Sequence, residues 1–149
     1  MKHRIRFIFA FFIFLLLNSQ CIFAYGETKK NYGNGIVSKI ISVYDGDTFW
    51  CDIQGFPPII GQYVRIRIAH IDAPEMTDLK PNIQLKAKAA KKFTDLKLRS
   101  AQRVELRNMH RDKYFRIVAE VSMDGQDLGS MLLKAGLAKP YEGGHRANW

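Results

Sequence analysis

The sequence predicts a mainly β domain with helices (α+β), built as a small five-stranded barrel that is closed or partly closed. Five short segments rich in β-branched and aromatic residues are separated by turns that contain Gly, Pro or Asp. One helical pattern follows the third segment and a second follows the fifth. Strands and helices therefore do not alternate as they would in a parallel sheet, which favours a barrel.

The first three predicted strands follow one another closely. Residues 36–44 are rich in Ile and Val, Asp45-Gly46 forms a turn, and residues 48–53 return as a second strand. A loop with two prolines covers residues 55–61. Residues 63–71 then alternate, so that one set of side chains faces the inside of the β-layer and the other faces outward: Tyr63, Arg65, Arg67 and Ala69 against Val64, Ile66, Ile68 and His70.

A helix is expected to begin near Pro81, because proline is well tolerated in a first helical turn. Its predicted apolar face has spacings of four, four and three residues: Leu85, Ala89, Phe93 and Leu96. Five lysines occupy other positions of this helix: Lys86, Lys88, Lys91, Lys92 and Lys97. They form either a solvated surface or a track for nucleic acid.

The remaining segments complete the predicted barrel. Strands are expected at residues 103–108 and 114–123, with a polar connection at 109–113 and a turn at Asp124-Gly125. A second helix covers residues 126–135 and ends at Gly136. Its predicted inward residues are Leu128, Met131, Leu132 and Ala135. A brief extended segment at 137–141 and a loop-like tail at 142–149 follow. This order of elements fits the OB-fold.

The first 24 residues have the form of an export signal. A basic start, with Lys2, Arg4 and Arg6, precedes an apolar run at residues 7–17 that is too short for a comfortable membrane span. We therefore expect a signal peptide at 1–24, a flexible lead-in at 25–35 and the folded domain at 36–149. A retained N-terminal anchor and a lipid-modified Cys21 are the alternatives.

Charge and cysteine content narrow the function further. Residues 1–24 hold three of the 23 Lys and Arg residues and none of the 14 Asp and Glu residues, so removing them leaves a net charge of +6. Such a charge attracts polyanions, or serves only solubility. Without Cys21, Cys51 has no partner for an internal disulfide. Cys51 lies in a predicted strand and is expected to be a small buried hydrophobic residue.

Two acidic motifs flank the prolines and the third strand. Asp45-Gly46-Asp47 is by itself a hairpin signal, and Asp72-Ala73-Pro74-Glu75 is by itself a turn. If the strands between them fold back on each other, Asp47 and Asp72 come close together. Two neighbouring carboxylates repel unless a cation lies between them, and a hard divalent ion suits oxygen ligands.

Arginines on two strands strengthen this interpretation. Arg67 lies five residues before Asp72, on the strand face that it shares with Ala69. Arg116 lies within an apolar strand pattern, where an unpaired charge is costly to bury. Arg116 must therefore meet a carboxylate, solvent or the phosphate of a ligand. The sequence favours a ligand phosphate and a plain salt bridge equally as the partner of Arg116.

Four motifs in this order resemble the staphylococcal-nuclease-like (thermonuclease) family over about residues 36–141. They are Asp45-Gly46-Asp47-Thr48, the run from Arg67 to Glu75, Asp112-Lys113-Tyr114-Phe115-Arg116, and Ala135-Gly136-Leu137-Ala138-Lys139. Each motif alone is weak, but the four together in this order and spacing are specific. The resemblance implies an OB-fold barrel and a Ca²⁺-dependent nuclease that cleaves DNA and RNA.

The resemblance also implies a role for each matching residue. Ca²⁺ would be bound by Asp47, Asp72 and the main-chain carbonyl of Ala73. Asp45 would support these ligands without contacting the ion itself. Glu75 would be the general base, and Arg67 and Arg116 would grip the phosphate at the reacting centre. A neighbouring phosphate would be held by three residues, of which the last matches only approximately: Lys113, Tyr114 and Tyr141.

We expect a monomer that acts on nucleic acid, with no protein partner and no membrane contact once the signal is removed. His70 is expected to have a structural role. A non-catalytic OB-fold that binds single strands is the main alternative to an enzyme. A protein that meets anionic lipid through its basic face is a second alternative, although it leaves the carboxylates unexplained.

Overall fold

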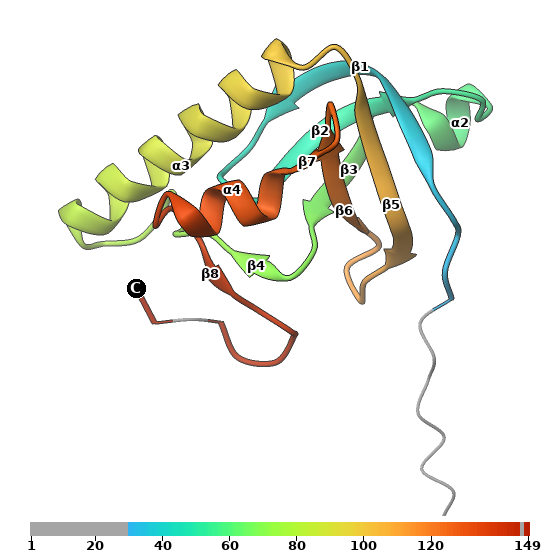
Figure 1. Ribbon diagram of the computed structural model, residues 1–149. Coiled ribbons are helices and arrows are strands. Elements are labelled where there is room, and N and C mark those ends of the chain that lie inside the picture. Colours follow the sequence, from blue (N-terminus) through green and yellow to red (C-terminus); the bar gives the residue numbers. More distant parts are fainter. Residues whose placement is uncertain (1–29, 147) are drawn as a thin grey trace, which may run out of the picture.

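The computed structural model describes residues 30–146 and 148–149. The barrel order is β3-β2-β1-β5-β6, and a parallel pairing of β3 with β6 closes it (Figure 1). This confirms the predicted five-stranded barrel of an α+β OB-fold. The five strands are β1 (Gly35–Val43), β2 (Thr48–Ile53), β3 (Val64–Ile68), β5 (Val104–Arg111) and β6 (Ile117–Met123).

Shorter elements join the barrel strands. Two-residue strands β4 (Ile71–Asp72) and β8 (Lys139–Pro140) pair with each other, and β7 (Gln126–Asp127) adds to the edge of β6. The helices are α2 (Pro58–Gly61), α3 (Pro81–Ser100) and α4 (Leu128–Lys134). Helices α3 and α4 contact each other on one side of the barrel (Figure 1). In the described part of the chain, none of the helices is both long and apolar enough to cross a membrane.

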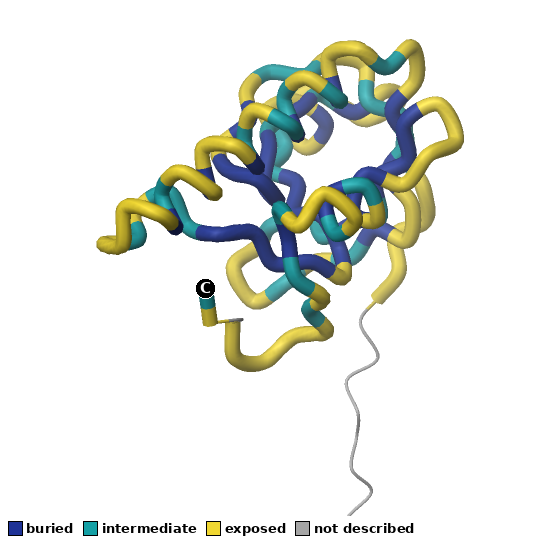
Figure 2. The backbone as a smooth tube through the Cα atoms, turned by 60° about the vertical axis from the view of Figure 1, so that its left-hand side comes forward, coloured by how far each residue is buried: buried dark blue, intermediate teal, exposed yellow. Residues whose placement is uncertain are grey.

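The barrel interior is apolar and tightly filled. Fully buried side chains from several strands and from α4 meet there, among them Phe49, Ile66, Leu106, Val121 and Leu132. Figure 2 shows the buried positions along the barrel strands and on the inner side of the helices. Cys51 lies in this core as a free cysteine, as expected. Burial raises the pKa of its thiol to about 12, so it does not form a thiolate at neutral pH.

Two predicted elements in the first half differ from the structure. The strand expected at 63–71 ends at Ile68, because the chain turns at His70, whose φ is 62°, before β4 begins. The break lets Asp72 leave the plane of the barrel sheet. The loop expected at 55–61 contains the single helical turn α2, which has Pro58 in its first turn.

The predicted inner face of the helix after Pro81 is wrong. Leu85 is 67% exposed and Leu96 is 58% exposed. The buried face instead consists mostly of small side chains: Ile83, Ala87, Ala90, Thr94 and Leu98. Small residues let the helix backbone approach the turn before β2 closely, and this approach outweighs the burial of two leucines.

The second half also shows shifted boundaries. Strand β5 continues to Arg111, so most of the polar connection expected at 109–113 is strand. Strand β6 begins at Ile117 rather than at residue 114. The helix expected at 126–135 begins only at Leu128, after β7, with the Asp127 side chain accepting from the Ser130 N–H at 2.6 Å. Ala135 is exposed, whereas Gly136 ends the helix with a φ of 64°, as a C-terminal cap does.

Candidate active site

The turn between β1 and β2 carries the first pair of acids. Asp45 Oδ1 accepts from the Asp47 N–H at 3.0 Å, and Tyr44 N–H donates to Thr48 O at 2.9 Å, which tightens the turn. Thr94 of α3 donates its hydroxyl to Gly46 O at 2.7 Å. An added Cβ on Gly46 would lie 2.6 Å from the Cβ of Ala90 and 2.8 Å from that of Ala73. Only glycine therefore lets helix, turn and the next acidic loop meet here.

The second acidic loop is fixed against the first. Asp47 Oδ2 accepts from the Ala73 N–H at 2.8 Å, and Ile68 N–H donates to Asp47 O at 2.8 Å. Pairing of β4 with β8 holds Asp72 in place. Both Asp47 and Asp72 are completely buried. Asp47 is thus bonded to the main chain of Ala73, 26 positions later, which brings it next to the Asp72 loop.

Arg67 joins the two buried carboxylates. Its Nη1 lies 2.7 Å from Asp47 Oδ1, and its Nη2 lies 3.2 Å from Asp72 Oδ1 and 3.2 Å from Ile71 O. Burial disfavours the guanidinium charge, but Asp47 and Asp72 outweigh it and raise the pKa of Arg67. Arg67 thus links the two acidic loops and also places a positive charge inside the site.

Asp45 is a buried carboxyl group directly beside Asp47. Burial and, after it, the charge of Asp47 raise the pKa of Asp45 to about 6. A bound cation would lower the electrostatic cost of three neighbouring carboxylates.

The donor atoms suit a hard divalent ion. Asp72 offers Oδ2, whose one contact among the described residues is a long one of 3.5 Å from Trp149 Nε1. Ala73 offers its main-chain carbonyl, and Asp47 offers a buried carboxylate. Within residues 30–146 and 148–149, no group of three or more His, Cys, Asp or Glu side chains is arranged for a metal. The expected ligand set differs from such a group because its third ligand is a carbonyl. The oxygens present fit Ca²⁺.

Glu75 lies three residues after Asp72 and is partly exposed. Its carboxylate is ion-paired with Arg146, from the C-terminal tail. The same guanidinium donates to Asp72 Oδ1, so Glu75 and Asp72 share a neighbour. The loop after β4 thus places the predicted base next to the predicted metal ligand.

Arg116 forms the salt bridge that the sequence left open. Its Nε donates to Asp112 Oδ2 at 2.7 Å, and its guanidinium carbon lies 5.4 Å from the Tyr114 ring centroid. Within the described residues, Arg116 forms no hydrogen bond with the two buried aspartates or with Glu75. It nevertheless lies two residues before Val118, which pairs with Arg67 across β3 and β6. Arg116 therefore lies close to Arg67 along the paired chains, just before β6 begins.

The residues predicted to hold a second phosphate lie around these arginines. Lys113 and Tyr114 are exposed in the turn between β5 and β6, with the lysine nitrogen 5.1 Å from the ring centroid. Tyr141 follows β8, and its ring centroid lies 5.5 Å from the guanidinium carbon of Arg67. The Nδ1 atom of His70 lies 3.1 Å from both carboxylate oxygens of Glu142.

Sequence reasoning missed several residues at the site. Arg146 and Trp149 contact Asp72 from 74 and 77 positions away, and the tail that holds them has no periodic pattern. Asp112 belongs to the third of the four motifs, but the motif does not by itself predict its pairing with Arg116 four residues later. The short spacing between these two opposite charges was the available signal.

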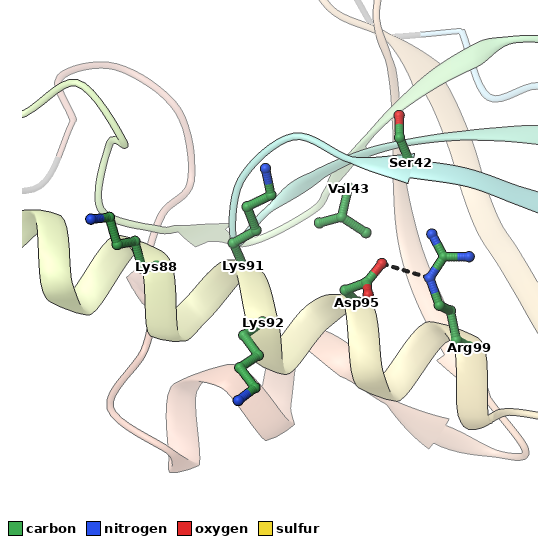
Figure 3. A pocket seen from close by; sticks show the side chains of 7 residues that line it. All are labelled: Ser42, Val43, Lys88, Lys91, Lys92, Asp95 and Arg99. Carbon is green, nitrogen blue, oxygen red and sulfur yellow. Dashed lines mark hydrogen bonds and ion pairs between the residues drawn. The ribbon is translucent and has the colours of Figure 1, made fainter.

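A basic hollow lies close in sequence to the acidic turn, and Figure 3 shows the side chains that line it. It is formed between the end of β1 and helix α3, and Asp95 and Arg99 at one end of it form an ion pair at 2.8 Å. Lys91 is partly buried, while Lys88 and Lys92 are exposed. The lining residues are Ser42, Val43, Lys88, Lys91, Lys92, Asp95 and Arg99.

Comparison with known proteins agrees with this geometry. The family model described as "Staphylococcal nuclease homologue" matches residues 65–148, which include Arg67, Asp72, Glu75 and Arg116. The thermonuclease of Staphylococcus intermedius is 32% identical over 85% of this chain and 71% of its own length. A probable endonuclease LCL3 of Podospora anserina is 33% identical over 80% of this chain, and an uncharacterized endonuclease of Haemophilus influenzae is 28% identical over 70%.

The chain spans about half the length of the last two relatives, 50% and 52% respectively. The family model covers more than half of the chain, and the thermonuclease is aligned over most of both sequences. The chain belongs to the family of staphylococcal nuclease homologues.

Proposed function

We propose that this protein is an exported nuclease that uses Ca²⁺ to hydrolyse phosphodiester bonds of DNA and RNA. One observation carries the proposal. Two completely buried aspartates, Asp47 and Asp72, converge around the guanidinium of Arg67, and Glu75 follows on the same loop. The names of the relatives, a thermonuclease and several endonucleases, support nucleic acid as the substrate class.

Three groups would hold the metal: the carboxylates of Asp47 and Asp72 and the carbonyl of Ala73. When bound, Ca²⁺ supplies positive charge that stabilises the charge developing on the phosphate. Asp45 supports this site through its hydrogen bond with the Asp47 main chain. Asp47 is also tied to the Ala73 N–H, so the ligands belong to one rigid unit.

Glu75 is the group best placed to take a proton from the attacking water. It is partly exposed, so water reaches its carboxylate, and its loop is anchored by the neighbouring buried Asp72. A positioned general base contributes a rate factor of about 10²–10⁴. The proton passes from water to the Glu75 carboxylate as the water oxygen bonds to phosphorus; one P–O ester bond then breaks, and the sugar oxygen that leaves takes up a proton from solvent.

Arg67 and Arg116 bind the phosphate and its developing negative charge. A planar guanidinium meets two oxygens at once, which a lysine does not. Asp112 Oδ2 accepts from Arg116 Nε and is ion-paired with its Nη2, both at 2.7 Å, and these contacts fix the orientation of the guanidinium. Lys113, Tyr114 and Tyr141 lie near these arginines and suit contacts with an adjacent phosphate.

Export rests on the basic start and apolar run of residues 1–24, which lie outside the described residues. Mass spectrometry of the protein recovered from an expressing bacterium tests it. Loss of the mass of the first 24 residues is expected, and an intact N-terminus would contradict a cleaved signal.

Plasmid and RNA cleavage tests the enzymatic proposal. We expect the chain to cut both in Ca²⁺ and neither in EGTA. Glu75→Gln and Arg116→Ala should each lose at least about 10²-fold in rate while still binding nucleic acid. Glu105→Gln, the same chemical change at an ion pair on β5, is the matched control and should keep full activity. Binding without cleavage at every Ca²⁺ concentration would instead identify a non-catalytic OB-fold.

A further inference from the structure

The C-terminal residues that the structure describes, 141–146 and 148–149, return to the active site, and we call them the strap. Tyr141 N–H donates to His70 O at 2.9 Å, and the Tyr141 hydroxyl donates to Gly144 O at 3.0 Å. Gly143 and Gly144 have φ values of 98° and 91°, which reverse the chain direction. In Figure 1 the strap loops away from β8 and comes back toward the start of α3.

Arg146 of the strap contacts the proposed catalytic groups. Its Nε and Nη2 lie 3.0 Å and 2.9 Å from Asp72 Oδ1, and Nη2 lies 3.4 Å from Ala73 O. Its Nη1 is ion-paired with Glu75 Oε1. One guanidinium therefore engages a metal-binding carboxylate, a metal-binding carbonyl and the general base together.

Trp149 anchors the end of the strap. Its ring centroid lies 4.5 Å from Lys139 Nζ and 5.1 Å from Lys86 Nζ, and its Nε1 points to Asp72 Oδ2 at 3.5 Å. Lys80 Nζ donates to the main-chain oxygen of Trp149 at 3.1 Å. These contacts come from β8, from α3 and from the residue before α3, so they hold the end of the strap beside Asp72.

We propose that the strap is an internal competitor of the metal ion, in which Arg146 and Ca²⁺ exclude each other from the oxygens of Asp72 and Ala73. This inference rests on the proposed function. The docked strap engages Asp72 Oδ1 and Ala73 O through Arg146, and Asp72 Oδ2 through Trp149, so the oxygens that would face a metal ion are occupied while the strap is in place. The Arg146 side chain remains 43% exposed, which keeps its ion pairs weak enough to open.

Docking of the strap also controls the base. While Arg146 is paired with Glu75, that carboxylate does not accept a proton from water. When Ca²⁺ binds and displaces the strap, the ion pair between Arg146 and Glu75 breaks. Glu75 then becomes available as a base in the same step that loads the metal. The strap thereby keeps the nuclease inactive wherever Ca²⁺ is scarce.

Calorimetric titration of Ca²⁺ into the full chain, without nucleic acid, measures this competition. A site blocked about nine-tenths of the time binds its ligand about tenfold more weakly than the open site. Arg146→Ala is therefore expected to bind Ca²⁺ about tenfold more tightly. Arg107→Ala removes the same charge from an exposed ion pair on β5 and should leave the affinity unchanged. Equal or weaker binding by Arg146→Ala overturns the strap proposal.

Asp72→Asn separates this failure from failure of the proposed function. If the unmodified chain binds Ca²⁺ and Asp72→Asn does not, the metal site stands whatever Arg146→Ala shows. If no variant binds Ca²⁺, both the calcium-dependent function and the strap proposal are wrong.

Tryptophan fluorescence gives a second, structural readout. The chain has two tryptophans, Trp50 and Trp149, so Trp50→Phe leaves Trp149 as the sole emitter. Ca²⁺ should make Trp149 more accessible to quenching by acrylamide, because the strap leaves the site. Unchanged quenching at saturating Ca²⁺ would overturn the proposal.

Discussion

Arg67 Nη1 lies 2.7 Å from Asp47 Oδ1, and both side chains are buried. Removing one partner of a buried ion pair leaves an uncompensated charge, which typically costs about 3–5 kcal/mol. Arg67→Met should therefore lower the free energy of unfolding by about 3 kcal/mol at neutral pH, besides abolishing cleavage. Urea denaturation measures the loss.

Ca²⁺ should restore part of that stability. The ion would neutralise the carboxylates that Arg67 bridges, so it should stabilise Arg67→Met more than the unmodified chain. Arg107→Met, at an exposed ion pair, should cost less than about 1 kcal/mol and show no such difference. An Arg67→Met protein as stable as the unmodified one would show that the buried pair contributes little.

The Asp112–Arg116 pair makes a second prediction, on both rate and stability. Asp112→Asn keeps an acceptor for the Tyr114 and Arg116 N–H groups but loses the charge that orients the Arg116 guanidinium. The cleavage rate should fall, though less than in Arg116→Ala. Unfolding at pH 7 should become easier by about 1 kcal/mol.

The pH dependence of this pair has a definite sign. Burial acts to raise the pKa of Asp112, but hydrogen bonds from Arg116 and Tyr114 outweigh it, so the pKa is lowered. A lowered folded-state pKa stabilises the fold above the unfolded-state value of about 3.9, and that contribution is lost as the pH falls through the folded-state pKa. The stability gap between the unmodified chain and Asp112→Asn should therefore narrow in acid. A gap that is constant from neutral to acidic pH would contradict the assignment.

The barrel and the acidic cluster were predictable because their signals are local. Residues 48–53 have the same bounds in the predicted and observed strand, and Gly136 has the positive φ expected of a helix cap. The meeting of Asp47 and Asp72 followed from strands that fold back on each other. These features depend on residue types and on short spacings along the chain, and both can be seen in a single sequence.

The inner face of α3 and the strap were not predictable in the same way. Leucine spacing suggested the wrong helix face, because the true face is selected by the closeness of Gly46 to Ala90. That closeness arises only after the helix has packed. Arg146 meets Asp72 across 74 residues, through a tail without periodicity, so its contact depends on the completed fold.

The Gly46 contact gives a third prediction. In Gly46→Ala the new Cβ would meet Ala90 and Ala73 well below normal contact distance. Overpacking of this kind costs about 1–3 kcal/mol, and the resulting shift would move Asp47 away from Asp72. Both the unfolding free energy and the Ca²⁺ affinity should fall, as measured by urea denaturation and calorimetry.

Two further variants isolate that packing effect. Ala90→Gly in the same chain should recover part of the Ca²⁺ affinity, because it removes the Ala90 contact and leaves the one with Ala73, although glycine within a helix itself costs about 1 kcal/mol of stability. Gly125→Ala has open space around the new Cβ but a φ of 85°, so it should cost stability and leave Ca²⁺ binding intact. Equal Ca²⁺ affinity in Gly46→Ala and the unmodified chain would contradict the role given to this contact.

The basic hollow of Figure 3 gives the last prediction. Its β1 side, Ser42 and Val43, leads within three residues into the acidic turn at Asp45, so the hollow adjoins the metal-binding turn. Nucleic acid extending past the cleaved bond would place phosphates near Lys88, Lys91 and Lys92. Each neutralised phosphate contributes about 0.7–0.9 to the slope of log affinity against log salt concentration.

Replacing these three lysines by Gln should therefore lower the magnitude of that slope by about 2. Fluorescence anisotropy of labelled oligonucleotides, in a Glu75→Gln background that prevents cleavage, measures it. The change should appear with long oligonucleotides and vanish with short ones, because only long strands reach the hollow from the site. The triple variant Lys39→Gln, Arg103→Gln and Arg107→Gln removes the same net charge from β1, β5 and the residue before β5. If both triple variants change the slope equally, the lysines of α3 act only as a solvated surface that contributes to the overall charge.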